Sequence, residues 1–410
     1  MEQEKTAPKK KKGWLLWVQW VLIALILLCV GGLVWGYLFP SQAPEVQPTV
    51  ATVPPYVYEE ADRVAQTLQE DAFLMAVVSD AHIGVNQSDG TNRRSAQLAS
   101  QGLQAVQKQQ PLDMLAMLGD YTYAGKTYSK ETVLRDLRLY RDIFKPLTVQ
   151  LPTVFLQGNH DTNHYANAED PNEPRLTLQE AFDQLGKHNT VGVTDSQNPS
   201  SNYGYADFEE HKIRVIYLNT CDSETYEIGI SPAQLRWLAE EALDVTDKED
   251  GNQWNILILS HHPLDWNYRT QYVIEILEDY QQGKADKIPY HHEDTKGEFH
   301  YDFSNMTLRA TVVANIHGHI HNFTSGQMGD EGWLLRVSIP NTSIDRNNQY
   351  DNDFAERDEA GEKVFWEKTP GTEEGTTFCV VAVDTENCTI SLSCFGAGYD
   401  RVYTYQPYQR

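Results

Sequence analysis

Five apolar stretches of this chain each end in side chains that carry carboxylate, amide or imidazole groups. The stretches are short and rich in aliphatic residues, as buried strands are. The polar residues that end them are Asp80 with His82, Asp120, Asn159 with His160 and Asp161, His261 with His262, and His317 with His319 and His321. Ligands of layered α/β folds bind beyond the carboxyl ends of the strands. We therefore expect these five strand ends to meet at one site.

The residue types at these strand ends suit a metal ion. Asp, His and Asn supply oxygen and nitrogen ligands of the kind that bind Mn, Fe, Zn or Mg. Taken singly, an Asp-x-His or a Gly-Asp pair is common, and a His at a strand end is more often a hydrogen-bonded surface residue than a ligand. The stretches Gly-Asn-His-Asp at 158–161 and Gly-His-Ile-His at 318–321 are more specific. All five together favour a metal site over packing.

The rest of the pattern predicts an α/β fold, because apolar runs alternate with stretches of helical periodicity. We expect strands at 73–80, 112–120, 152–161, 212–220, 254–262, 311–319, 333–339, 377–384 and 388–394. We expect helices near 59–71, 92–109, 129–145, 175–186, 232–243 and 269–282. Two polar, acidic segments, 281–305 and 341–376, do not fit this alternation. We expect both to be loops, and the second to act as a lid or a specificity element.

The N-terminal region predicts a membrane anchor. Residues 14–39 contain no charged side chain, and this segment is long enough to span a bilayer. Four lysines at 9–12 precede this segment and predict a cytoplasmic N-terminus. We divide the chain into a basic tail at 1–12, a transmembrane helix at 13–39, a Pro-rich linker at 40–57 and a catalytic domain at 58–410. A cleaved signal peptide is the alternative, although its apolar region is usually shorter.

The net charge limits the possible binding partners, whereas the cysteine content does not fix the disulfide pairing. The formal net charge of -25 should repel polyanions, so we expect no nucleic-acid partner. Cys388 and Cys394 fall at even spacing on one expected strand, so they should share a face and be too far apart to bond each other. The pairing of these two cysteines with Cys221 or Cys379 stays open.

The ordered series Asp-x-His, Gly-Asp, Gly-Asn-His-Asp, His-His-Pro and Gly-His-x-His resembles the calcineurin-like metallophosphoesterases. The resemblance covers most of residues 72–400. It implies a four-layer αββα sandwich, in which two mixed β-sheets are flanked by helices. It also implies a site for two divalent or trivalent metal ions that share a hydroxide nucleophile. The reaction would be hydrolysis of a phosphoester bond.

The resemblance assigns a role to each strand-end residue. Asp80, His82 and His321 would hold one metal, whereas Asn159, His261 and His319 would hold the other, with Asp120 bridging the two. His160 would act on the leaving oxygen of the substrate as a catalytic residue. Asp161 would either orient His160 or make a hydrogen bond within its loop, and these two roles are equally supported.

Other residues are assigned to supporting roles. His262 would lie behind the metal ligands, and His317 would be structural. Tyr123 occupies the position of a metal-binding tyrosine in purple acid phosphatases, but His82 already fills that role. We interpret His291, His292 and His300 as part of a solvated loop.

The resemblance implies an enzyme that acts on a small phosphodiester or phosphomonoester. The stretch at 119–125 lacks the Asp and Arg of the protein phosphatases in this superfamily, which argues against a protein substrate. Alternatives are a monoesterase similar to purple acid phosphatases and an inactive surface-binding module on the same fold. The sequon at Asn322 lies directly beside His321 and favours a bacterial host, with the domain outside the cell membrane.

Overall fold

The computed structural model describes residues 52–84, 91–125, 128–164, 166, 174–224, 226–292, 295–343, 368–369, 372 and 375–407. The chain divides into residues 1–52 and residues 53–410, and the fold belongs to the second unit. The expected tail and transmembrane helix lie outside the described residues. Among the helices that are described, none combines the length and the apolar character needed to cross a bilayer.

The first sheet has six strands in the order β15-β14-β13-β1-β2-β3. The central strand β1 (Phe73–Val78) pairs in parallel with β2 (Met114–Met117), and β2 pairs in parallel with β3 (Thr153–Phe155). On its other side β1 pairs antiparallel with β13 (Thr377–Asp384). The strands β14 (Thr389–Gly396) and β15 (Arg401–Thr404) continue the antiparallel half.

The second sheet has seven strands in the order β11-β12-β10-β7-β6-β5-β4. Its four parallel strands are β12 (Leu334–Ser338), β10 (Thr311–His317), β7 (Asn255–Ser260) and β6 (Ile213–Tyr217). The antiparallel strands are β11 (Thr324–Met328) at one edge, and β5 (Gly204–Phe208) followed by β4 (Val193–Thr194) at the other. The expected α/β class with two large mixed sheets is therefore confirmed.

Side chains alternate across a strand, so each sheet has two faces, and both faces are covered. In β1, Leu74, Ala76 and Val78 pack in one apolar cluster with the helices. Phe73, Met75 and Val77 pack in another cluster, which also contains side chains of β6, β7 and β10. The two sheets therefore pack face to face, and burial of each such side chain contributes roughly 1.5–3 kcal/mol.

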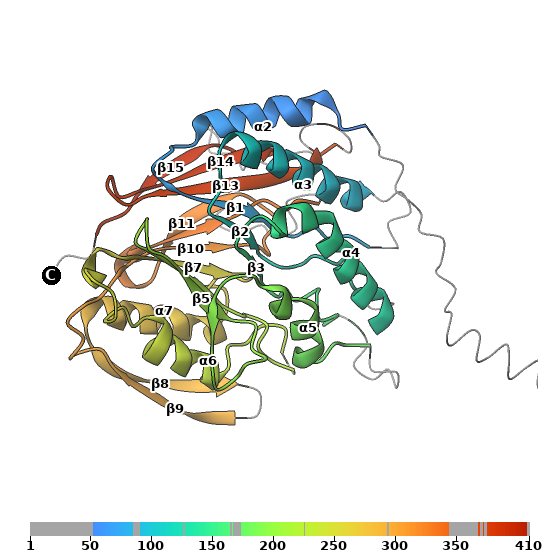
Figure 1. Cartoon of the computed structure of the whole chain (residues 1–410). Coiled ribbons are helices and arrows are strands. Elements are labelled where there is room, and N and C mark those ends of the chain that lie inside the picture. Colours follow the sequence, from blue (N-terminus) through green and yellow to red (C-terminus); the bar gives the residue numbers. More distant parts are fainter. Residues whose placement is uncertain are drawn as a thin grey trace, which may run out of the picture. The chain divides into compact units, whose positions relative to one another are not determined.

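Helices cover the outer faces of the sheets (Figure 1). The helices α2 (Pro55–Thr67), α3 (Thr91–Gln109) and α4 (Lys130–Thr148) pack on the first sheet. The helices α6 (Pro232–Trp237) and α7 (Tyr268–Gln282) pack on the second. A short helix, α5 (Leu178–Gln184), begins with a capping box made by Thr177 and Glu180. All six expected helices are present, although α2 begins four residues early because Pro54 and Pro55 suit a first helical turn.

The expectation of a loop at 281–305 is wrong. This segment contains an antiparallel hairpin of β8 (Ala285–His292) and β9 (Thr295–Asp302), which lies beside α7 in Figure 1. Ile288 and Phe299 are buried against the second sheet's helices, whereas Lys287 and Glu298 pair on the exposed face at 2.8 Å. Because one face of this hairpin is polar, its strands contain no continuous apolar run that would mark them in the sequence. His291, His292 and His300 are accordingly strand residues rather than loop residues.

One pair of cysteines forms a disulfide between two neighbouring strands. Cys379 of β13 and Cys394 of β14 are directly opposite each other and form a disulfide. Cys388 precedes β14 in a turn with φ of 52°. The expectation that Cys388 and Cys394 share one strand is therefore wrong, because the hairpin turn ends only after Cys388. Cys221 is buried and unbonded.

Candidate metal centre

The expected site residues lie where parallel strands of both sheets end. Asp80 and His82 follow β1, Asp120 follows β2, and Asn159 follows β3. From the second sheet, His261 and His262 follow β7, while His319 and His321 follow β10. The face-to-face packing of the sheets brings these two sets of strand ends together.

Four of the expected ligands form what we call the first cluster: Asp80, His82, His321 and the shared Asp120. One ligand atom from each lies within 4.8 Å of the others. The two imidazole Nε2 atoms of His82 and His321 face each other at 2.9 Å. Asp80 Oδ1 lies 3.3 Å from the His321 Nε2, and Asp120 Oδ2 lies 3.8 Å from the His82 Nε2.

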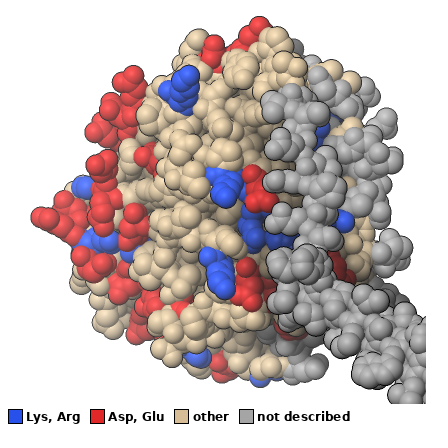
Figure 2. Space-filling model, turned by 45° about the vertical axis from the view of Figure 1, so that its right-hand side comes forward, with Lys and Arg blue, Asp and Glu red and all other residues tan. Residues whose placement is uncertain are grey.

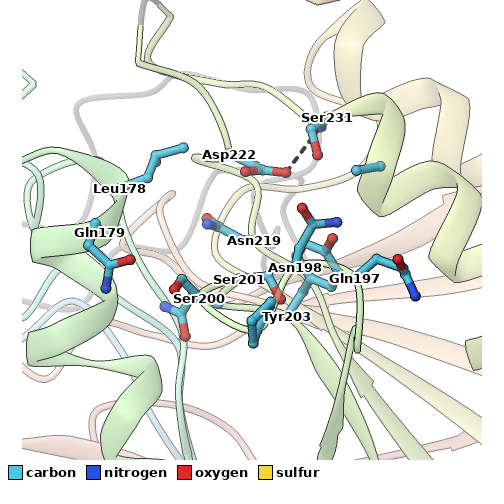
Figure 3. Close-up of a pocket in the computed structure, with 13 residues that line it drawn as sticks. Leu178, Gln179, Gln197, Asn198, Ser200, Ser201, Tyr203, Asn219, Asp222 and Ser231 are labelled. Atoms are coloured by element: carbon cyan, nitrogen blue, oxygen red, sulfur yellow. Dashed lines mark hydrogen bonds between the residues drawn. The ribbon is translucent and has the colours of Figure 1, made fainter.

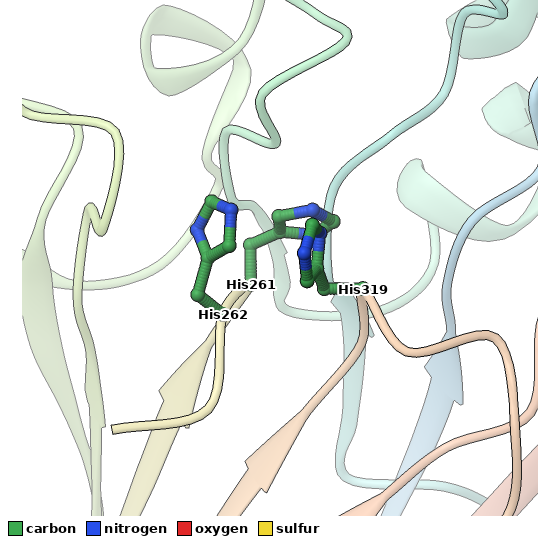
Figure 4. A group of neighbouring side chains, drawn as sticks. All are labelled: His261, His262 and His319. Atoms are coloured by element: carbon green, nitrogen blue, oxygen red, sulfur yellow. The ribbon is translucent and has the colours of Figure 1, made fainter. Parts of the chain in front are cut away.

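Asn159, His261 and His319 form the second cluster with the same Asp120. His261 Nε2 lies 3.0 Å from Asn159 Oδ1 and 3.2 Å from Asp120 Oδ2. Figure 4 shows the His261 and His319 rings turned toward each other, with His262 beside them. Ligand atoms of these three histidines also lie within 4.8 Å of one another. Asp120 is the side chain that contacts both clusters.

The donor set fits metal ions. Asp80 and Asp120 are buried, with 0% and 1% of their side chains exposed. Buried carboxylates need a compensating positive charge. Burial by itself raises the pKa of Asp80, but attraction to His321 lowers that pKa well below its ordinary range. An ionised carboxylate and two converging imidazole nitrogens are the ligands that Mn, Fe or Zn prefers.

Histidine protonation is set by the surroundings of each ring. Burial lowers the pKa of His319 to about 3, with repulsion from His261 adding to the effect, so His319 is the neutral imidazole that a metal ligand must be. Burial also acts to lower the pKa of His261, but the Asp120 carboxylate raises it to about 9, so His261 pairs with Asp120 as a cation and would release a proton when a metal binds. His261 Nδ1 donates to the carbonyl of Leu118 at 2.8 Å, which aims its Nε2 at Asp120.

The backbone at five of the expected ligands is in the left-handed region. The φ angles are 52° at Asp80, 43° at His82, 54° at Asp120, 69° at His319 and 53° at His321. Such conformations cost a non-glycine residue of order 1–3 kcal/mol and persist where the surrounding structure holds them. Packing alone gives no reason for this strain to gather at the ends of three strands.

Two motif glycines are required by the close approach of the site carboxylates. A Cβ on Gly158 would collide with the Asp120 carboxylate, at 2.8 Å from its Cγ. A Cβ on Gly318 would lie 2.6 Å from Asp80 Oδ2. The glycine in each motif therefore makes room for a ligand that comes from a different strand.

His160 lies between the two clusters and the surface. Its backbone N–H donates to Asp120 Oδ1 at 2.8 Å, and its ring stands 4.7 Å from the ring of His82. The ring Nδ1 lies 2.7 Å from the carbonyl oxygen of Tyr123. A carbonyl can only accept, so Nδ1 carries the hydrogen and Nε2 is the basic nitrogen.

Asp161 holds the loop that carries Asp120. Its two carboxylate oxygens accept hydrogen bonds from the backbone amides of Asp120, Tyr121 and Gly158 at 2.8–2.9 Å, and from Thr122 at 3.3 Å. These contacts fit the loop hydrogen bond that the sequence left open as one of two roles. Asp161 thus holds the loop of Asp120 in place, and its orientation of His160 stays a prediction.

The remaining expected residues surround the clusters. His262 is buried, and its Nδ1 lies 2.9 Å from Thr220 Oγ1. His317 donates from Nδ1 to the Gly318 carbonyl at 2.8 Å, and burial lowers its pKa to about 3. The ring of Tyr123 is 43% exposed and lies 6.4 Å from that of His82.

Sequence reasoning missed one residue of the site, Glu227. Its Oε1 accepts a hydrogen bond from Asn159 Nδ2 at 3.0 Å. This contact fixes the amide so that Oδ1 faces His261. Glu227 follows no apolar run and belongs to the loop between β6 and α6, so no strand-end signal marks it.

The chain belongs to the calcineurin-like phosphoesterase family, whose family model matches residues 73–323. A search of curated proteins found no match. The structure of Haemophilus influenzae NAD nucleotidase is similar over 81% of this chain and 49% of its own, with 13% identity and a TM-score of 0.34. This chain thus spans about half the length of that nucleotidase. Chaetomium thermophilum Vps29 is similar over 82% of this chain and its whole length, with 11% identity and a TM-score of 0.25.

Proposed function

We propose that this protein hydrolyses a small-molecule phosphoester with two metal ions, one held by each cluster and both by Asp120. The observation that supports this most is the convergence of seven expected ligands, from five strand ends, around one shared carboxylate. When bound, the metal ions would neutralise charge on the phosphoryl oxygens and lower the pKa of water. Mn, Fe, Zn and Mg all suit the donors.

His160 is the residue that would handle the proton of the leaving group. Its Nδ1–H is committed to the Tyr123 carbonyl, so proton exchange with substrate falls to Nε2. The backbone N–H of the same residue donates to Asp120, which ties the ring to the centre of the site. A protonated Nε2 would donate to the leaving oxygen as its bond to phosphorus breaks.

The surroundings of the clusters support a small organic phosphoester as substrate. Tyr123 and Trp266 are exposed by 43% and 38%, and each lies beside one cluster, near His82 and His319 respectively. Such rings can pack against the organic part of a substrate. On the face in Figure 2 the acidic side chains gather mainly along the left-hand side and several basic ones lie nearer the middle, and the net charge of the chain is -25. This charge would disfavour a nucleic-acid polymer.

We further propose that the catalytic domain faces the outside of a bacterial cell, anchored by residues 13–39. The support is the uncharged segment at 14–39 after four lysines. Protease added to intact cells should digest the domain beyond Pro44. Complete protection of the domain would contradict this orientation.

The activity is tested with a panel of phosphomonoesters and phosphodiesters, using the purified full chain with and without added Mn²⁺. His160→Ala should keep its metal content but lose turnover by roughly 10²–10⁴-fold, the usual contribution of a general acid. The loss should shrink for nitrophenyl esters, whose leaving group needs little protonation.

A matched control is His188→Ala, which changes an exposed histidine outside the site. Absence of hydrolysis of every ester by metal-loaded protein would overturn the proposed function. Loss of metal from His160→Ala with unchanged turnover per metal pair would instead make His160 a ligand.

A further inference from the structure

Three aromatic side chains are strongly exposed among the described residues, and two of them lie at the metal clusters. Tyr58, Tyr123 and Trp266 are exposed by 51%, 43% and 38%. Tyr58 belongs to α2, which packs on the first sheet away from the site. The ring of Tyr123 lies 6.4 Å from that of His82, whereas the ring of Trp266 lies 5.4 Å from that of His319. Each cluster therefore has its own exposed ring.

The backbone around Trp266 is held in place although its ring is exposed. Both carboxylate oxygens of Asp265 lie 3.0 Å from Nη1 of Arg336, a residue of β12 that is 3% exposed. On the other side, the Asn267 side chain accepts from the Arg269 amide at 2.9 Å and begins α7. Because both neighbours of Trp266 are anchored, its ring is positioned before a ligand arrives, which lowers the cost of binding.

The indole of Trp266 is oriented so that a ligand can pack against it. Its plane makes an angle of 88° with the imidazole of His319. In such an edge-to-face pair one ring presents its edge, so His319 covers at most one face of the indole. An exposed aromatic face suits a planar ring, which stacks on it with little loss of entropy.

The cavity beside α5 offers no such ring. It has a volume of about 380 Å³ and lies between the start of α5, the loop 197–203 and the residues that connect β6 to α6 (Figure 3). Tyr203, the aromatic residue that lines it, is 2% exposed and packs on Trp237 with ring centres 4.9 Å apart. An aromatic group would therefore find exposed rings at the metal clusters and not in this cavity.

The position of His160 separates the roles of the two exposed rings. Its imidazole, which would protonate the leaving oxygen, lies 4.7 Å from the ring of His82 and contacts the Tyr123 carbonyl. The leaving group should therefore lie on the side of the first cluster. In a monoester the other phosphoryl oxygens are bare, so no organic group lies beside the second cluster. A diester carries a second organic group, which stays on phosphorus and can reach Trp266.

We propose that the substrate is a phosphodiester whose retained organic group is a planar ring that packs on Trp266. This inference rests on the proposed hydrolysis and names its substrate class. Water adds to phosphorus, the bond from phosphorus to the leaving oxygen breaks, and His160 gives that oxygen a proton. The products are an alcohol and a monoester that still carries the ring. Trp266 touches the substrate without taking part in bond breaking, so it determines specificity.

Three nitrophenyl esters with one common leaving group test this proposal on the full chain with Mn²⁺. They are the nitrophenyl half-esters of phenylphosphonate and cyclohexylphosphonate, which resemble diesters, and the monoester nitrophenyl phosphate. The group bonded to phosphorus through carbon cannot leave, so it is always the retained group. The wild type should have its highest kcat/KM for the phenyl compound.

Trp266→Ala should lower kcat/KM for the phenyl compound by roughly 5–150-fold, the usual contribution of aromatic stacking, mainly through KM. It should leave hydrolysis of nitrophenyl phosphate unchanged. Trp266→Phe keeps a ring and should recover most of the loss. Tyr58→Ala, which removes an exposed ring on α2, is the matched control and should behave like the wild type.

Calorimetry with phenylphosphonate and cyclohexylphosphonate gives a readout that needs no turnover. Phenylphosphonate should bind the wild type more tightly, and Trp266→Ala should remove that advantage. The proposal is overturned if nitrophenyl phosphate is the best substrate, or if Trp266→Ala changes the phenyl and cyclohexyl compounds alike. Absence of hydrolysis of every ester would overturn the proposed function, whereas hydrolysis without these preferences would overturn this inference alone.

Discussion

The two clusters share Asp120 but differ in charge and in what supports them. The first cluster adds a second carboxylate, Asp80, to its two imidazoles. The second cluster instead adds the neutral amide of Asn159, and a carboxylate, Glu227, stands behind that amide. Beyond the shared Asp120, the second negative charge would therefore contact the metal directly in the first cluster, whereas in the second cluster it acts through the Asn159 amide.

This difference predicts unequal affinities for metal ions. Two carboxylates in direct contact favour a small, hard or trivalent cation, whereas one shared carboxylate with imidazole and amide ligands suits a more weakly held divalent ion. The second cluster should consequently be the first to lose its metal to a chelator. Its affinity should also depend on Glu227, since partners that orient a ligand tune the site.

The shared carboxylate should give the largest effect. Asp120→Asn removes the charge that both clusters use and leaves an amide nitrogen facing His82 or His261, which lie 3.8 Å and 3.2 Å from Asp120 Oδ2. We expect metal content to fall from about two to near zero per chain and hydrolysis to fall with it. Elemental analysis and turnover are measured on the same preparation.

The matched control is Asp136→Asn, a buried aspartate on α4 outside the site. Retention of one full metal equivalent in Asp120→Asn would break the comparison, because it would show that one cluster does not depend on the shared carboxylate.

A smaller and more selective effect is expected at Glu227. Glu227→Ala removes the acceptor that fixes the Asn159 amide, and such supporting partners contribute roughly 10–100-fold in metal affinity. Only the second cluster should weaken, so calorimetric titration with Mn²⁺ should show one unchanged and one weakened step. Glu227→Gln keeps the acceptor without its charge and should recover part of the loss.

Glu224→Ala, on the same loop but hydrogen-bonded to the Leu178 amide, should leave both metal steps unchanged. Equal weakening of both steps in Glu227→Ala would contradict an assignment to the second cluster alone.

Most of the strands and all six helices could be predicted because their apolar periodicity is local. The site could be predicted for the same reason, since each ligand directly follows a strand and parallel strands end at one edge. The hairpin β8–β9 was missed because only one of its faces is apolar. The antiparallel strands β4, β5, β11 and β15 were missed because no continuous apolar run marks them in the sequence.

Residues that act across long separations could not be predicted. Glu227 contacts Asn159 over 68 positions of sequence, and no motif links the two. The role of Asp161 stayed open because the sequence does not show which way its carboxylate points. It could face the ring of His160 or the backbone amides of a neighbouring loop.

The smallest effect is expected at Ser79, which supports the first cluster as Glu227 supports the second. Ser79 Oγ donates to Asp80 Oδ2 at 2.5 Å, and the His319 amide donates to the same oxygen at 3.0 Å. Ser79→Ala therefore removes one of two donors, and the remaining amide keeps the carboxylate in place. A hydrogen bond to an ionised carboxylate contributes about 1.5 kcal/mol at the low end, so the first metal step should weaken by about tenfold while the second is unchanged. Ser100→Ala, which loses the bond to the Ile143 carbonyl and a long one from Gln104 Nε2 on the helical side, is the matched control for stability. If Ser79→Ala weakens metal affinity at the first cluster as much as Glu227→Ala does at the second, a carboxylate ligand needs as much support as an amide ligand. The contrast between the clusters would then rest on charge alone.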